Sequence, residues 1–156
     1  MAEENRQIQV ELRVERMYVK DASFESPGAP LIFTEQFNPS INVDIESSVN
    51  SLGDDRHEVV LTTTVTARRD EDKVAYVVEV HQAGIFLIKG VDGGPLRQIL
   101  SVTCPTMLFP YLREAIDNLV IKGGFAALQL APVNFEALFE QAVRENAAKA
   151  EGETTH

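Results

Sequence analysis

Residues 104–143 read CPTMLFPYLREAIDNLVIKGGFAALQLAPVNFEALFEQAV and combine two helix-like patterns with an uncharged connection between them. The first half of this stretch repeats apolar residues at the i, i+3, i+4, i+7 spacing of one helix face. The stripe consists of Leu108, Tyr111, Leu112, Ala115, Ile116, Leu119 and Val120. Pro105 suits the first turn of this helix, where its missing N–H costs nothing. Gly123 and Gly124 predict the helix end, because glycine adopts the left-handed C-cap conformation without steric penalty.

The linker that follows, residues 125–132, reads FAALQLAP and carries no charge. Surface connections are normally polar, so such a linker either packs into the domain core or offers its side chains to a partner. The same two interpretations apply to Phe135 and Phe139. These residues belong to a second amphipathic helix, which is expected to begin after Asn134, a good N-cap. The apolar stripe of that helix consists of Leu138, Phe139, Ala142, Val143 and Ala147.

Upstream of residue 104, apolar and polar residues alternate with the period of half-buried strands. Alternation from Ile8 changes phase at Arg16, after which Met17 and Val19 carry the apolar set, so a bulge is predicted near Arg16. Strands are expected over residues 8–25, 41–46, 57–67 and 74–88. The breaks between them are expected at residues 26–30, 47–56 and 68–73. A turn at residues 92–95 and a short helix at 96–102 complete the chain order.

Four strands joined by short turns predict an antiparallel sheet, because parallel strands need long crossovers. Strands first and helices last indicate an α+β fold. We therefore expect a four-stranded antiparallel sheet, as a meander or of Greek-key type, with a long helix and a C-terminal helix on one face. Residues 1–150 are predicted to form a single domain, and residues 151–156 a disordered tail.

The composition restricts the possible partners. The formal charge of -10 argues against binding to nucleic acid or to anionic membranes. It also means that copies of the chain repel one another, so any oligomer must be held by apolar contacts. One cysteine cannot form an internal disulfide, which favours a reducing compartment. No leader-like or membrane-spanning segment is apparent, so a cytoplasmic protein without direct membrane insertion is expected.

A search for catalytic or metal-binding patterns finds none: there is no phosphate-binding loop, nucleophile elbow or paired-cysteine motif. Cys104 precedes a predicted helix, but His57 and His81 lie on predicted strands and give it no paired base. Three histidines and one cysteine make a poor zinc set. We therefore expect no enzyme, no cofactor and no metal site.

Four motifs in order carry a family resemblance: KDxSFE from residue 20, EVxQxGIF from residue 79, CPxxLFPYxRE from residue 104 and GFxxLxLAPVNFxALF from residue 124. Together they resemble the SecB family of bacterial export chaperones, from about residue 10 to about residue 143. The resemblance implies a homotetramer, a dimer of dimers, with the long helix in the dimer–dimer interface. It also implies an ATP-independent holdase that keeps unfolded secretory precursors in the cytoplasm and delivers them to the SecA motor.

The resemblance further implies two sites. A groove for client polypeptide would be formed by Val43, Ile45, Phe125, Leu128, Leu130, Phe135 and Phe139. A surface for the basic, zinc-bearing C-terminal tail of SecA would be formed by Asp21, Glu25, Val77 and Glu79, with the zinc belonging to SecA. Strand alternation independently puts Val77 and Glu79 on one face. Without the resemblance, Asp21 and Glu25 would be ordinary surface carboxylates.

Two alternatives share these features. One is a SecB-like chaperone dedicated to a toxin–antitoxin system, and the other is a structural oligomeric adaptor that binds no client. A small-molecule enzyme would require a closed pocket with convergent polar groups, which the sequence does not indicate.

Overall fold

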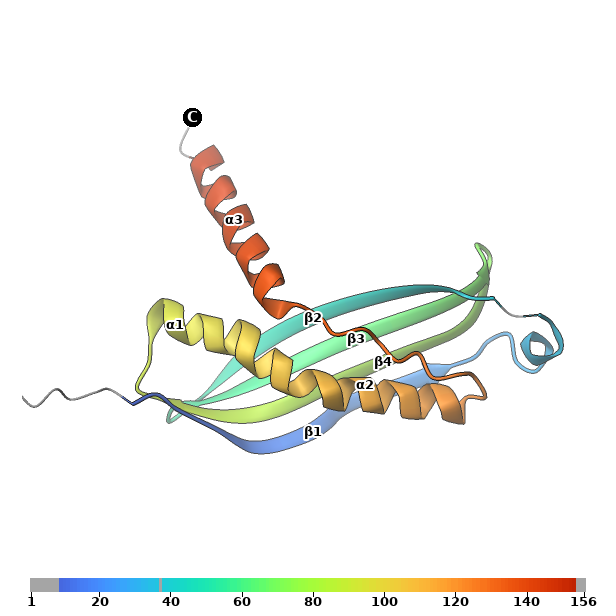
Figure 1. Ribbon diagram of the computed structural model, residues 1–156, viewed down its shortest axis with the longest axis horizontal. Helices are drawn as coiled ribbons and strands as arrows, with labels where there is room; N and C mark the ends of the chain where they lie inside the picture. Colours follow the sequence, from blue (N-terminus) through green and yellow to red (C-terminus); the bar gives the residue numbers. More distant parts are fainter. Residues whose placement is uncertain (1–8, 37, 154–156) are drawn as a thin grey trace, which may run out of the picture.

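The computed structural model describes residues 9–36 and 38–153. It confirms the α+β class: one sheet is crossed by a long helical segment, and a final helix leads away from it (Figure 1). In chain order the elements are β1 (Glu11–Glu25), the 3-10 helix η1 (Leu31–Thr34), β2 (Ser40–Gly53), β3 (Arg56–Asp70), β4 (Lys73–Lys89), α1 (Gly93–Gln98), the π turn η2 (Ile99–Thr103), α2 (Cys104–Lys122) and α3 (Phe135–Glu153).

The four strands are antiparallel in the order β1-β4-β3-β2. Consecutive hairpins join β2, β3 and β4, while β1 lies beside β4 and reaches β2 by a longer connection, which is the Greek-key arrangement. Asp54 and Asp55, at the β2–β3 turn, both have positive φ, as a two-residue type I′ hairpin requires. This tight turn places β2 directly beside β3, and the strand order leaves β2 at one edge of the sheet.

The turn predicted over residues 47–56 is wrong, because β2 continues through it to Gly53. Ser47 pairs with Leu61, and Val49 pairs with Val59. These two β3 residues are fully buried, so backbone pairing to a core strand outweighs the low strand propensity of the serine-rich segment.

β1 contains the bulge that the phase change predicts, between Val14 and Arg16. A second register shift, between Val19 and Asp21, was not predicted. The two shifts keep Phe24 on the side of the helices, packed against the core, although the simple alternation has been interrupted twice.

The core lies between the sheet and the helical segment α1–η2–α2, of which α2 packs against β4, β3 and β1. One face of α2 is buried through Leu108, Leu112, Ile116 and Val120. The turn expected at residues 92–95 is instead the start of a helical run from Gly93 to Lys122. Cys104 therefore lies inside this run and not at a free helix N-terminus.

α2 ends as predicted. Gly124 has φ +89°, and the amide N–H groups of Gly124 and Phe125 donate to the carbonyls of Ile121 and Val120 at 3.0 and 3.1 Å. This pair of bonds is the Schellman arrangement that stops a helix. It turns the chain back, so that the linker, followed by residues 133–134, runs beside α2 toward the base of α3 (Figure 1).

α3 begins as predicted, since the Asn134 side-chain oxygen accepts the Ala137 N–H at 3.0 Å. The helix then projects away from the sheet (Figure 1). It continues to Glu153, so residues 151–153, where a tail was expected, are helical. Residues 154–156 and Ile8, where the first strand was expected to begin, lie outside the described residues.

Candidate functional site: an apolar groove and an acidic face

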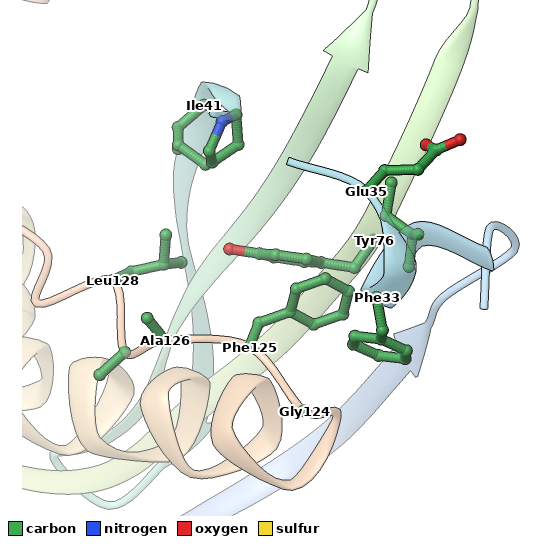
Figure 2. Close-up of a pocket in the computed structure, with 11 residues that line it drawn as sticks. Phe33, Glu35, Ile41, Tyr76, Gly124, Phe125, Ala126 and Leu128 are labelled. Atoms are coloured by element: carbon green, nitrogen blue, oxygen red, sulfur yellow. The ribbon is translucent and has the colours of Figure 1, made fainter. Parts of the chain in front are cut away.

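A cavity of about 430 Å³ opens where the linker faces η1 and the start of β2. Figure 2 shows side chains from four parts of the chain converging on it: Phe33 from η1, Ile41 from β2, Tyr76 from β4, and Phe125 and Leu128 from the linker. Its volume falls within the range of ligand pockets. The lining is mainly apolar, so the cavity suits an apolar side chain.

The base of this cavity is aromatic. The Tyr76 ring is only 2 % exposed and lies 4.7 Å, centroid to centroid, from the ring of Phe125. The ring of Phe33 lies 5.1 Å from that of Phe125 and is half exposed, whereas the ring of Phe24 stacks on Tyr76 at 5.7 Å. Burial, reinforced by the negative charge of Asp117, raises the pKa of the Tyr76 hydroxyl. The hydroxyl stays protonated and points along the cavity between Ile41 and Leu128 (Figure 2).

One side of β2 continues the apolar surface beyond the cavity. Ile41, Val43 and Ile45 alternate on the side of the sheet that faces the helices, opposite Ala67, Val65 and Thr63 of β3. Ile41 and Val43 remain 39 % and 38 % exposed, because α2 packs on the other strands. Within the described chain β2 pairs only with β3, so its outer backbone edge is available. Together, the cavity, the linker and this side of β2 form an apolar groove, called the groove below.

The structure brings five of the seven predicted groove residues to this surface. Val43 and Ile45 come from β2, while Phe125, Leu128 and Leu130 come from the linker and are half buried against the core. The linker thus partly satisfies both interpretations: it packs on the core and still contributes to an open cavity.

Phe135 is placed differently from the prediction. Its side chain is 5 % exposed, and its ring meets that of Phe109 edge-on at 6.3 Å. Phe135 is therefore a core residue that attaches the base of α3. Phe139 is half buried one turn further along, while Leu138 and Val143 are exposed.

Sequence reasoning missed Phe33, Ile41 and Tyr76 as groove residues. Ile41 could have been found, because it continues the alternation of Val43 and Ile45. Tyr76 was recognised only as a strand residue, and nothing in the local pattern links it to the linker. Phe33 follows a Pro-rich break that carries no periodicity.

The opposite face of the sheet is acidic. Register pairs Glu25 with Val77, Ser23 with Glu79 and Asp21 with His81, and partners in an antiparallel pair point to the same side. Val78 and Val80 face the helices, so all four residues predicted for the second site lie on the face away from them. The carboxylate of Glu79 accepts from Thr64 at 3.2 Å and lies 3.5 Å from His81 Nε2. We call Asp21, Glu25, Val77 and Glu79 the acidic patch.

A neighbouring carboxylate, that of Glu58, is paired within the protein. Glu58 accepts from the Tyr18 hydroxyl and lies 3.0 Å from Lys20 Nζ. The hydrogen bond from Tyr18, followed by that from Lys20, lowers the pKa of Glu58. Burial and the same carboxylate raise the pKa of Tyr18 to about 12. Glu58 is thus ionised but paired, and it offers little charge to a partner.

Cys104 is the one cysteine of the chain, and it is buried. Burial raises the pKa of the Cys104 thiol to about 12, which disfavours the reactive thiolate. No cluster of three or more His, Cys, Asp or Glu side chains that could hold a metal occurs in residues 9–36 and 38–153. In the same residues, no helix is long and apolar enough to cross a membrane.

Curated relatives named protein-export protein SecB match nearly the whole chain, and three of them serve as examples. The Marinobacter nauticus protein is 52 % identical over 94 % of this chain and 88 % of its own length. The Pseudomonas aeruginosa protein is 48 % identical over 92 % and 88 %, respectively. The Alcanivorax borkumensis protein is 45 % identical, and the match covers 99 % of this chain and 99 % of its own length.

A solved structure with the same fold is that of a SecB-like chaperone of Mycobacterium tuberculosis in complex with an antitoxin peptide. It matches with a TM-score of 0.65 at 13 % identity, over 78 % of this chain and 90 % of that one. The model of the family described as preprotein translocase subunit SecB matches residues 4–146. The chain therefore belongs to the SecB family and is a protein-export chaperone.

Proposed function

We propose that this chaperone is an ATP-independent holdase, which binds unfolded secretory precursors in the cytoplasm and delivers them to the SecA motor without making or breaking a covalent bond. The observation that carries the proposal is the groove, because it is apolar, lined by aromatic rings and uncovered along β2. In an adaptor that binds no client, apolar side chains such as Val43 and Phe33 would be expected to be covered.

The client is held by several weak contacts in this proposal. Burying one Leu- or Phe-sized side chain contributes about 1.5–3 kcal/mol, so a few occupied positions hold a chain without sequence specificity. The contact residues are Val43, Ile45, Phe125, Leu128, Leu130 and Phe139, joined by Phe33 and Ile41, while the buried Tyr76 forms the base beneath them. Phe135 takes a supporting role here, because its side chain is already buried.

The acidic patch is the proposed docking site for the basic C-terminal tail of SecA. Its carboxylates project from neighbouring strands, and Lys20 is already engaged by Glu58, so it does not neutralise them. Opposite charges steer encounter and fix register. The zinc ion belongs to the SecA tail in this proposal, and the chaperone supplies only carboxylates and the apolar surface of Val77.

Homotetramer formation is proposed through the outer side of α2. Tyr111 and Ile121 are exposed there, at 53 % and 56 %. Apolar contacts of this kind can overcome the repulsion between chains of formal charge -10. The 45–52 % identity to export proteins favours export over a dedicated toxin–antitoxin role.

The test combines two measurements on the full chain. Native mass spectrometry should give a tetramer alone and a tetramer carrying client after addition of an unfolded preprotein. Light scattering should show that aggregation of the diluted preprotein is suppressed at a stoichiometric amount of chaperone, with no nucleotide present. A tetramer that neither retains client nor changes the aggregation would exclude the holdase and favour the adaptor.

A further inference from the structure

The linker that forms one wall of the groove is tied to α2 by a single carboxylate. Asp117 Oδ1 accepts the backbone N–H of Leu128 at 3.0 Å and that of Gln129 at 3.2 Å. Asp117 lies on α2 and is half buried, so these two charge-assisted bonds are partly shielded from water.

Apart from the packing of Leu128, Leu130 and Val133 against the core, little else holds this segment. Residues 126–133 form neither helix nor strand. In the described part of the chain, their backbone takes part in no hydrogen bond other than these two. The nearest backbone bonds are the helix stop at Phe125 and the helix start at Asn134. The linker therefore has fixed ends, and Asp117 holds it at a point between them.

The point of attachment is also strained. Gln129 has φ +50°, in the left-handed region that disfavours residues other than glycine. Such a conformation persists only where the surroundings enforce it. The two N–H groups that Asp117 binds lie on either side of the Leu128 Cα, so the carboxylate fixes the Leu128–Gln129 peptide plane directly before the strained residue.

The attachment coincides with the groove wall. Leu128 and Phe125 line the cavity opposite Ile41 (Figure 2). A linker freed at Leu128 would let these apolar side chains move into the cavity or away from β2. Either displacement changes the space that a client side chain would enter.

We propose that Asp117 is a positioning residue of the groove, which holds the linker wall at the distance from β2 that client binding requires. The proposal rests on the holdase function proposed above. Asp117 touches no client in it, and it acts only through the backbone of Leu128 and Gln129.

The test compares Asp117→Ala with Asp117→Asn in the full chain. The probe is a fluorescently labelled lactalbumin, reduced and alkylated so that it stays unfolded, and its Kd is measured by anisotropy. Asp117→Ala should weaken binding about tenfold, because it removes two bonds to a charged acceptor. Asp117→Asn should stay within about threefold of the parent, since its amide oxygen can still accept both N–H groups. Glu114→Ala, an exposed carboxylate of α2 that makes no bond to the linker in the described chain, is the control for lost charge.

Hydrogen exchange followed by mass spectrometry supplies the direct readout. The amides of Leu128 and Gln129 should exchange faster in Asp117→Ala, while those of β3, β4 and α2 keep the parent's rates. Should Asp117→Ala fail to fold, Asp117→Ser, whose hydroxyl is too short to reach both amides, carries the same expectation.

Parental client affinity in Asp117→Ala overturns the proposal, whether or not the linker exchanges faster. A loss that is equal in Asp117→Asn and Asp117→Ala also overturns it, because the charge and not the attachment would then matter. A parent protein that binds no probe contradicts the holdase itself, and faster linker exchange in Asp117→Ala would still show the attachment.

Discussion

At the scale of single residues, the aromatic base of the groove depends on a glycine that is needed for space. Gly123 has an ordinary helical φ of −74°, so conformation does not require glycine there. A Cβ added at this position would lie 2.1 Å from Cζ of Phe24. Phe24 stacks on Tyr76, which is buried, so the ring cannot move without disturbing its neighbours. The end of α2 is thereby coupled to the cavity.

Gly123→Ala should therefore lower the free energy of unfolding by about 1–3 kcal/mol, as expected for overpacking. Urea denaturation measures the change. Gly94→Ala is the matched control, because nothing lies within 4 Å of the added methyl and alanine favours a helix. Equal stability of Gly123→Ala and the parent would mean that Phe24 is free to move aside.

The proposed role of the acidic patch depends on the negative charge of Glu79. Glu79→Lys should weaken binding of the zinc-loaded C-terminal tail of SecA about tenfold or more, since a charge-assisted contact becomes a repulsion. Client binding should be unchanged, because Glu79 lies on the face away from the groove. Calorimetric titration of the tail measures the effect, with Glu140→Lys on exposed α3 as the control for net charge. Undiminished tail binding would show that Glu79 takes no part in docking the SecA tail.

At the scale of elements, the patterns that depend on neighbours along the chain were predicted well. The glycine stop, the Asn134 cap and the bulge near Arg16 are local signals, and the structure contains each of them. The stripe of α2 also packs on the core, except at Tyr111, which is 53 % exposed. The failures depend on partners distant in sequence. β2 extends to Gly53 because β3 pairs with it, and the groove includes Phe33 and Tyr76 because the chain returns beside them. No periodicity in a single segment reports such neighbours.

The base of α3 is attached to the core through Phe135. Phe135→Ala should free the base of α3, because the buried contact with Phe109 is lost. Amides of residues 135–145 should exchange faster, and the unfolding free energy should fall by about 3 kcal/mol. Leu138→Ala, an exposed position of the same helix, should change stability by less than about 0.5 kcal/mol. Parental exchange in Phe135→Ala would show that other contacts hold α3.

At the scale of the whole molecule, opposite faces of one sheet carry different chemistry. The side with the helices presents apolar residues, and the other presents carboxylates. The two partners should therefore respond differently to salt.

Raising salt from about 0.1 M to about 1 M shortens the Debye length from about 10 Å to about 3 Å. Binding of the basic SecA tail should weaken accordingly, while client affinity should hold or increase slightly. Self-assembly should tighten, because screening reduces repulsion between chains of charge -10. Anisotropy titrations and native-state sedimentation at both salt concentrations measure the three responses. Client binding that weakens in parallel with tail binding would contradict the apolar groove.

The open edge of β2 has one more consequence. Asp44 and Glu46 project from this strand between its apolar residues, on the face away from the helices. Two copies aligned edge to edge through this segment would bring their carboxylates side by side, and like charges opposite one another destabilise a strand pair. An uncharged extended peptide meets no such penalty. The edge is therefore protected against filament growth between copies while it stays accessible to foreign chains.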